Sequence, residues 1–255
     1  FNVKCLDLNK GYYVDYTTRN DTEKCFRKHM LTTNGMWLYT EQFGIRHVVY
    51  HNGEFKTTDY NTTNHNIPEN KVSYMVEDSK GNVWAIASHH AMRIDKNGKL
   101  NIVNKQIKPI DLRSEGDNIV VFDTNNTVWN YTASGKLKHH TKLPMMLGVV
   151  DKISTSMIWQ GSYYLFTANE TYAYNLSTGQ WSKPQDIQIP KALDQGYNGG
   201  YHFIGNNKDG NLWIFPKNGK YKKLHVMNHL SSDPGREHIY NITAVSDSLL
   251  AIATY

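Results

Sequence analysis

Glycine-containing turns recur along the whole chain at nearly constant spacing. Each turn follows a run of aromatic and β-branched residues and precedes a polar run. The six turns are Lys10-Gly11, Asn52-Gly53, Asn97-Gly98, Ser134-Gly135, Thr178-Gly179 and Asn218-Gly219. Successive glycines are 42, 45, 37, 44 and 40 residues apart. Because Asn-Gly supplies the two positive φ angles of a type I′ turn, we predict a β-hairpin at each position.

The runs between the turns predict an all-β chain, because short apolar segments rich in aromatic and β-branched residues favour strands over helices. Upstream of each turn we expect two further strands. The apolar, inner members are expected at residues 36–41, 83–88, 119–124, 163–168, 201–206 and 249–254. The strands after the turns are rich in Lys, Thr and His, as in "KLKHHTK". Such polar strands are typical of the exposed edge of a sheet.

A period of about 40 residues with four strands per repeat is typical of the blades of a β-propeller. The chain ends two strands into a sixth repeat, at residues 249–255, and residues 1–18 supply the two missing strands. We therefore predict one propeller domain over residues 1–255, with six four-stranded blades and the last blade shared between the N- and C-termini. The alternative is that the chain is a piece of a longer array.

Composition excludes several classes of protein. The chain of 255 residues carries 28 Lys and Arg against 23 Asp and Glu, and this net charge of +5 is scattered without a basic block, so no nucleic acid partner is expected. No apolar run approaches the roughly 18 residues of a membrane span, so we expect no membrane insertion by this segment. Cys5 and Cys25 lack metal-ligand spacing, and whether they form a disulfide stays open. The first residue, Phe1, predicts a processed protein or an excised piece.

The stretch "EDSKGNVWAIAS" predicts a tight turn followed by a buried tryptophan. Asp78 is expected to accept hydrogen bonds from backbone N–H groups two residues on, and Gly81 to take a positive φ. Trp37 and Trp84 occupy equivalent inner positions and are expected to pack between adjacent blades. We interpret these residues as structural.

Residues 31–48 and 67–95 resemble the two-component regulator propeller repeat, and residues 208–213 form a partial third copy. The matching residues are Gly35, Trp37, Gly44, Ile45 and Arg46 in the first copy, and Pro68, Asn70, Asp78, Gly81, Asn82, Trp84, Met92 and Arg93 in the second. The resemblance implies a periplasmic sensor region of a bacterial hybrid two-component system, with a transmembrane and kinase region as its downstream partner. Members of this family usually have seven blades, so six blades is a departure.

Loops that join second to third strands, and loops that join one blade to the next, gather on one face of a propeller. The long connections 60–70, 184–200 and 228–238 are expected there, and long loops in a compact domain are often functional. A sugar-binding surface needs flat aromatic rings and planar polar groups. The residues predicted to bind ligand are Glu41, Phe43, His89, His90, Glu170, Tyr197, Arg236 and His238. The alternative is that they form an ordinary polar rim.

We expect a non-catalytic, periplasmic or extracellular ligand-sensing propeller, with a small-molecule or oligosaccharide ligand and with no metal or other cofactor. The sequence has no nucleophile elbow, no zinc-binding helix motif and no phosphate-binding glycine loop. One alternative is a glycosidase or lyase, whose best catalytic group would be His89 and His90 with Glu41 or Glu170. The other is a scaffold that binds protein, including a second copy of itself.

Overall fold

The computed structural model describes residues 3–7, 12–16, 28–40, 42–64, 67–144, 153–189, 192–198, 201–206, 211–225, 239–246 and 249–254. Every regular element within these residues is a β-strand, which confirms the prediction of an all-β chain. This described part of the chain has no helix of the length and apolar character needed to cross a membrane.

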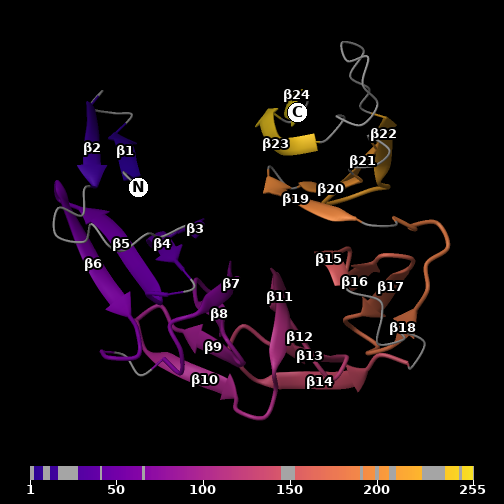
Figure 1. The fold of residues 1–255 in the computed structure, drawn as a ribbon, viewed down its shortest axis with the longest axis horizontal. Helices are drawn as coiled ribbons and strands as arrows, with labels where there is room; N and C mark the ends of the chain where they lie inside the picture. The colour runs from indigo at the N-terminus through magenta and orange to yellow at the C-terminus, as the bar shows by residue number, and fades with distance from the viewer. Residues whose placement is uncertain are drawn as a thin grey trace. The chain divides into compact units, whose positions relative to one another are not determined.

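Four consecutive strands form each of five antiparallel sheets in the described part of the chain (Figure 1). We number these sheets one to five. Their strands are β3 (Lys28–Thr32), β4 (Gly35–Tyr39), β5 (Ile45–His51) and β6 (Glu54–Tyr60) in sheet one; β7 (Val72–Glu77), β8 (Val83–Ala87), β9 (His90–Ile94) and β10 (Leu100–Asn104) in sheet two; β11 (Pro109–Glu115), β12 (Asn118–Asp123), β13 (Thr127–Tyr131) and β14 (Leu137–Lys142) in sheet three; β15 (Ile153–Trp159), β16 (Ser162–Thr167), β17 (Thr171–Asn175) and β18 (Trp181–Ser182) in sheet four; and β19 (Leu193–Asn198), β20 (Tyr201–Asn206), β21 (Asn211–Pro216) and β22 (Lys222–His225) in sheet five. Strands pair in chain order, as in propeller blades.

The other described strands form a two-stranded sheet near each end of the chain. β1 (Val3–Asp7) pairs with β2 (Tyr12–Tyr16), and β23 (Ile239–Ser246) pairs with β24 (Leu249–Thr254). These are the strand pairs that a shared sixth blade requires. No sheet among the described strands is closed, so the six-blade count and the shared blade stay predictions.

The predicted inner strands correspond to β4, β8, β12, β16, β20 and β24, with ends that differ by two residues at most. Burial explains why they were recognisable: all five residues of β8 are buried, and so are the last five of β12. The fourth strands β6, β14 and β22 are mainly exposed or half-buried. The polar sequences after the glycine turns therefore do form exposed edges.

The chain divides into two compact units, residues 1–138 and 139–255. In the first unit the cores lie between consecutive sheets. Trp37 of sheet one packs in one cluster with Met75 and Met92 of sheet two. Trp84 of sheet two packs in another with residues of sheet three, including Tyr131. The prediction that Trp37 and Trp84 pack between adjacent blades is confirmed.

The second unit has the same construction. Trp159 and Phe166 of sheet four share a buried cluster with Trp213 and Phe215 of sheet five. The ring centroids of Trp159 and Phe215 are 5.1 Å apart in an edge-on arrangement, and the Trp159 indole N–H donates to the Pro216 carbonyl at 2.6 Å. Large aromatic residues thus join neighbouring sheets in both units.

The hairpin turns are not all of the predicted type. Asn52 and Gly53 both have positive φ, at 53° and 88°, as a type I′ turn requires. At Asn97-Gly98 only Gly98 of the turn has positive φ, and the turn is closed by bonds from Gly98 N–H to the Asp95 carbonyl and from Asp95 N–H to the Lys99 carbonyl. The reason is Asp95, whose Oδ1 accepts from the N–H groups of Asn97 and Lys99, both at 2.9 Å, and so favours a longer turn.

The buried carboxylate of Asp78 organises the turn between β7 and β8. Its Oδ1 accepts from the backbone N–H groups of Lys80 and Asn82, both at 2.9 Å, and Gly81 has a φ of 75°. Both predictions for this turn are confirmed. Its Oδ2 accepts from the Trp84 indole N–H at 2.9 Å and from the Asn82 side-chain amide at 2.8 Å. One side chain therefore fixes the turn and also positions the tryptophan that fills the space between sheets two and three.

Asp123 makes the same arrangement at the opposite end of sheet three, in the turn between β12 and β13. Its Oδ1 accepts from the N–H groups of Asn125 and Thr127, at 2.8 and 3.0 Å, and its Oδ2 accepts from the Trp129 indole N–H at 2.8 Å. Asn126, with a φ of 60°, occupies the position in this turn that Gly81 occupies in the Asp78 turn. In both turns, an aspartate six residues before a tryptophan thus accepts a hydrogen bond from its indole N–H.

Replacing Asp78 with alanine should lower the free energy of unfolding by about 2–4 kcal/mol, because the Asn82 and Trp84 donors lose their buried acceptor. Ser79→Ala, an exposed change in the same turn, is the matched control and should stay within about 0.5 kcal/mol of the parent. Urea denaturation followed by tryptophan fluorescence measures both. Equal stability of the two variants would contradict the role given to Asp78.

Candidate functional site

In sheets one, three and four, the loop that joins the second strand to the third begins with a side chain that accepts hydrogen bonds from the loop's own backbone. Thr40 Oγ1 accepts from the N–H groups of Gln42 and Phe43, at 2.7 and 3.0 Å. Thr167 Oγ1 accepts from those of Asn169 and Glu170, at 3.3 and 3.0 Å. Asp123 does the same in sheet three. These three loops are therefore fixed by their first residue. We refer to the end of the sheets that carries them as the loop end.

Ser88 occupies the equivalent position in sheet two, directly after β8, but it makes no such bond. Ala87 pairs with His90, so the loop has only two residues, Ser88 and His89. Ser88 Oγ and His90 Nδ1 are both buried without a hydrogen-bond partner in the described part of the chain. Ser88 also has a φ of 47°, in the left-handed region that is uncommon for residues other than glycine. Unpaired buried groups and local strain together are typical of functional sites.

Backbone hydrogen bonds bring the loops of sheets one and two to the same place. Gly44 N–H donates to the Asn70 carbonyl at 3.0 Å, and Val72 N–H donates to the Thr40 carbonyl at 2.9 Å. Ser88 N–H donates to the Lys71 carbonyl at 2.7 Å. The connection between the two sheets therefore holds the Thr40–Gly44 loop on one side and the Ser88 loop on the other.

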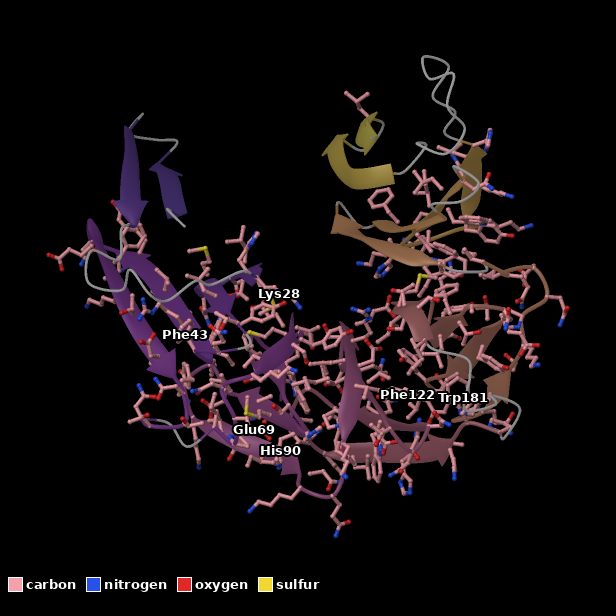
Figure 2. All side chains as sticks on the ribbon, in the orientation of Figure 1. Lys28, Phe43, Glu69, His90, Phe122 and Trp181 are labelled. Carbon is pink, nitrogen blue, oxygen red and sulfur yellow. The ribbon has the colours of Figure 1, made fainter. Side chains whose placement is uncertain are left out.

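Gly44 is required at the base of the first loop. Its φ is 80°, and a Cβ at this position would collide with the Tyr60 carbonyl oxygen. The close approach keeps the loop tight against the connection to sheet two. Figure 2 labels Phe43, Glu69 and His90 in this part of the first unit.

Three predicted ligand-binding residues stand at this loop end. Phe43 and His90 are half-buried, and His89 is exposed. Because the two loops are bonded to one connection, Phe43 and the two histidines lie at the same end of sheets one and two. The residues that sequence reasoning missed are Thr40 and Ser88, although "YTEQFG" and "ASHHAM" place a hydroxyl at the same position after an apolar strand.

The other five predicted ligand-binding residues lie outside the described residues, have an undescribed side chain, or belong to the second unit. Glu41, Arg236 and His238 lie outside the described residues. Tyr197 lies in β19, and its side chain is not described. Glu170 belongs to the second unit, at the loop end of sheet four.

Glu170 is held as a carboxylate by its neighbours. Lys183 Nζ donates to both of its oxygens at 2.8 Å, and the Tyr172 hydroxyl also donates to it. The Lys183 ammonium lies 5.2 Å from the centroid of the Tyr172 ring. Hydrogen bonds from Lys183 and then from Tyr172 lower the pKa of Glu170. A carboxyl group in this state is ionised at neutral pH and is unsuited to donate a proton.

One-residue bulges mark the loop end of first strands in both units. The register of the first strand shifts against the second at Ser73, Ile110, Ser154, Gln195 and Tyr240. Bulges twist a strand and re-aim side chains, and they are enriched near binding sites. No group of three or more His, Cys, Asp or Glu side chains that could hold a metal ion occurs within the residues described above.

Comparisons with protein-family models and with curated proteins give no match. Solved structures are similar in fold. Catalytically inactive virginiamycin B lyase from Staphylococcus aureus with quinupristin has a TM-score of 0.62 and 15% identity, over 98% of this chain and 84% of that chain. A streptogramin B lyase has a TM-score of 0.62 and 16% identity, over 99% and 83%.

The extracellular domain of a protein described as a hybrid two-component system, BT4673 from B. thetaiotaomicron, has a TM-score of 0.58 and 12% identity. The match covers 94% of this chain and 34% of that chain. Identities this low show the fold alone. Together with the five four-stranded sheets, these structures show that the chain has a propeller-type, all-β fold.

Ser88→Gly should raise the free energy of unfolding by about 0.5–1 kcal/mol, because glycine adopts a positive φ without strain and the unpaired hydroxyl is removed. Thr167→Ala, at the equivalent position of sheet four, should lower it by about 1 kcal/mol because two loop N–H groups lose their acceptor. Urea denaturation of both variants gives the comparison. A loss of stability in Ser88→Gly would show that this serine is a structural residue like Thr167.

Proposed function

We propose that the chain is a non-catalytic ligand-binding propeller that acts as the extracytoplasmic sensor of a two-component regulatory system. Its ligand, an oligosaccharide or another small molecule, binds at the loop end of sheets one and two. The observation that carries this proposal is the Ser88 loop. It departs from the hydrogen-bonding pattern of the other described loops, and it leaves Ser88 Oγ and His90 Nδ1 buried and unpaired beside the exposed His89.

The groups at this end suit a sugar. Phe43 offers a half-buried ring for the apolar face of a pyranose, and the histidines offer planar donors and acceptors for hydroxyl groups. A hydroxyl group of the ligand that reaches Ser88 Oγ or His90 Nδ1 would give these atoms the partner that the protein does not supply. Unpaired groups of this kind discriminate strongly between ligands that can and cannot bond to them.

The proposal that the chain is non-catalytic is supported by the state of Glu170. The lowered pKa of this carboxyl group disfavours it as the general acid of a glycosidase. The fold likeness to virginiamycin B lyase and streptogramin B lyase keeps a lyase as the second candidate. The two functions differ in one respect: a sensor binds without changing its ligand.

The periplasmic or extracellular location and the downstream signalling partner are proposed from the repeat motif and from the extracellular domain of BT4673. We further propose that β23 and β24 combine with β1 and β2 into a sixth blade. The end strands supply the first and second strands at one terminus and the third and fourth at the other, which is the combination that a shared blade needs.

Binding to a panel of neutral and acidic oligosaccharides, measured by isothermal titration calorimetry, tests the proposed function. We expect saturable binding by at least one glycan and a loss of affinity of tenfold or more in the His89→Ala/His90→Ala double variant, because two polar contacts at the centre of the site are removed. The matched control is His51→Ala, an exposed histidine at the opposite end of sheet one. It should bind like the parent.

The same mixtures, analysed by chromatography after prolonged incubation, should contain unchanged glycan. New reducing ends or unsaturated products would instead establish the lyase or glycosidase candidate. Undiminished binding by the double histidine variant would place the ligand elsewhere on the chain.

A further inference from the structure

Cationic and phenolic side chains of sheets one to three contact one another along the first strands of these sheets and β4. We define the inner-strand patch as Lys28 of β3, Tyr39 of β4, Tyr74 of β7 and Arg113 of β11. Lys28 pairs with Tyr39, the residue before Thr40, and Tyr74 pairs with Ile86, two residues before Ser88. The register therefore places Lys28, Tyr39 and Tyr74 toward the same end of the sheets as the proposed ligand site, whereas Arg113, which pairs with Val120, lies nearer the β11–β12 turn.

Contacts link the members of the patch in a chain. Lys28 Nζ donates to the Ser73 carbonyl at 3.2 Å and lies 5.9 Å from the centroid of the Tyr39 ring. Ser73 is the bulge residue of β7, so its carbonyl is released from the regular ladder toward β3. The Arg113 guanidinium carbon lies 5.9 Å from the centroid of the Tyr74 ring.

The Tyr39 hydroxyl is held in its protonated form. Burial, followed by the neighbouring Tyr74, raises the pKa of Tyr39, and Arg113 opposes this shift. The Lys28–Ser73 hydrogen bond and the contact of Arg113 with the Tyr74 ring show that residues of sheets one, two and three lie close together here. At neutral pH the patch therefore offers a phenolic donor beside two permanent cations.

The patch has a net positive charge. Asp111 is buried and lies 3.5 Å from Arg113, so it balances one of the two cations, and the exposed Lys28 stays uncompensated by any ion pair among the described residues. Glu77 lies at the opposite end of β7, where Thr33 Oγ1 donates to its carboxylate at 3.1 Å. Glu77 is thus separated from Lys28 along the inner strands.

Lysines recur at the start of the first strands. Lys28 begins β3, Lys71 and Lys108 directly precede β7 and β11, and Lys152 directly precedes β15 in the sequence. The carbonyls of Lys71 and Lys108 accept from Ser88 N–H and Thr124 N–H, which fixes both residues at the loop end. Both are exposed, and so is Glu69, the acidic residue nearest to Lys71 in the sequence. Lys28, Lys71 and Lys108 therefore place three exposed cations at the loop end of the first unit.

We infer that the ligand of the proposed site is an acidic oligosaccharide and that the inner-strand patch binds its carboxylate or sulfate group. This inference rests on the proposed function and adds the chemical class of the ligand to it. Lys28 and the Tyr39 hydroxyl can both donate to an oxyanion, and the Tyr74 ring supports the planar guanidinium of Arg113 beside them. Phe43, His89 and His90 then contact the remainder of the sugar chain.

The test compares acidic glycans with their neutral counterparts by isothermal titration calorimetry on the full chain. The probes are a galacturonic acid tetramer with its methyl ester, and a sulfated galactose tetramer with its desulfated form. At least one acid should bind about tenfold more tightly than its neutral partner, because charge-assisted hydrogen bonds are stronger than neutral ones. This preference should shrink as NaCl increases, since salt screens the exposed Lys28.

Lys28→Gln should remove most of the preference for the acid, measured as the ratio of the acid and neutral affinities in the same variant. Lys28 is exposed, so a thermal melt followed by circular dichroism should match that of the parent. Lys56→Gln, an exposed lysine on the outermost strand of sheet one, is the matched control and should retain the preference. Arg113→Gln should act like Lys28→Gln, but it also deprives the buried Asp111 of its ion-pair partner.

The failure of the inference and the failure of the proposed function give different results. Equal affinity for both acids and their neutral partners, or an unchanged preference in Lys28→Gln, overturns the inference. Neutral binding that still depends on His89 and His90 would then leave the proposed function in place. Absence of binding by every glycan would overturn both.

Discussion

The bond from the Trp84 indole N–H to the buried Asp78 carboxylate is the interaction on which the packing of sheets two and three depends. Asp78 accepts from the backbone of its own turn and from Trp84, and Trp84 then fills the core between sheets two and three. A small four-stranded sheet buries too little surface to hold its position alone. Asp78 holds Trp84 in one orientation, and sheet three packs against it. Asp123 and Trp129 repeat this bond in sheet three.

Side chains accept hydrogen bonds from the turn backbone in other turns as well. Asp95, Thr132 and Asn175 each accept from backbone N–H groups within their own turns, beside Gly98, Gly135 and Gly179 with positive φ. Local side chains thus satisfy the backbone groups that the ladders leave unpaired. The Ser88 loop is an exception to this pattern. Its serine hydroxyl has no hydrogen-bond partner among the described residues, and the loop lies at the same end of the sheets as Phe43.

Much of the fold follows from the sequence because glycine spacing and apolar runs are local signals. They give the inner strands, the exposed outer strands and the packing of Trp37 and Trp84. The prediction of a type I′ turn at Asn97-Gly98 was wrong, because the Asp95 side chain, two residues earlier, accepts a hydrogen bond from the backbone N–H of Asn97. The Asp123–Trp129 pair was not predicted, because Asn126 occupies the position at which the Asp78 turn has Gly81.

The site was less predictable, because its residues are joined by hydrogen bonds between segments that are distant in the sequence. Phe43 and the histidines were predicted as members of one face, and the connection at Asn70 and Lys71 explains why they share it. Nothing in the spacing of Lys28, Tyr39, Tyr74 and Arg113 indicates a cluster, since each lies on a different strand. Pairing and register bring Lys28, Tyr39 and Tyr74 toward one end, and the contact with the Tyr74 ring joins Arg113 to them.

The central claim is that the loop end of sheets one and two binds the ligand while the opposite end is structural. Amide hydrogen exchange measured by mass spectrometry, with and without a saturating bound oligosaccharide, tests it most directly. The account predicts slower exchange in peptides that cover residues 40–44 and 86–92, and unchanged exchange in peptides that cover the turns at 51–54 and 95–99. Protection confined to those turns, or spread evenly over the chain, would contradict it.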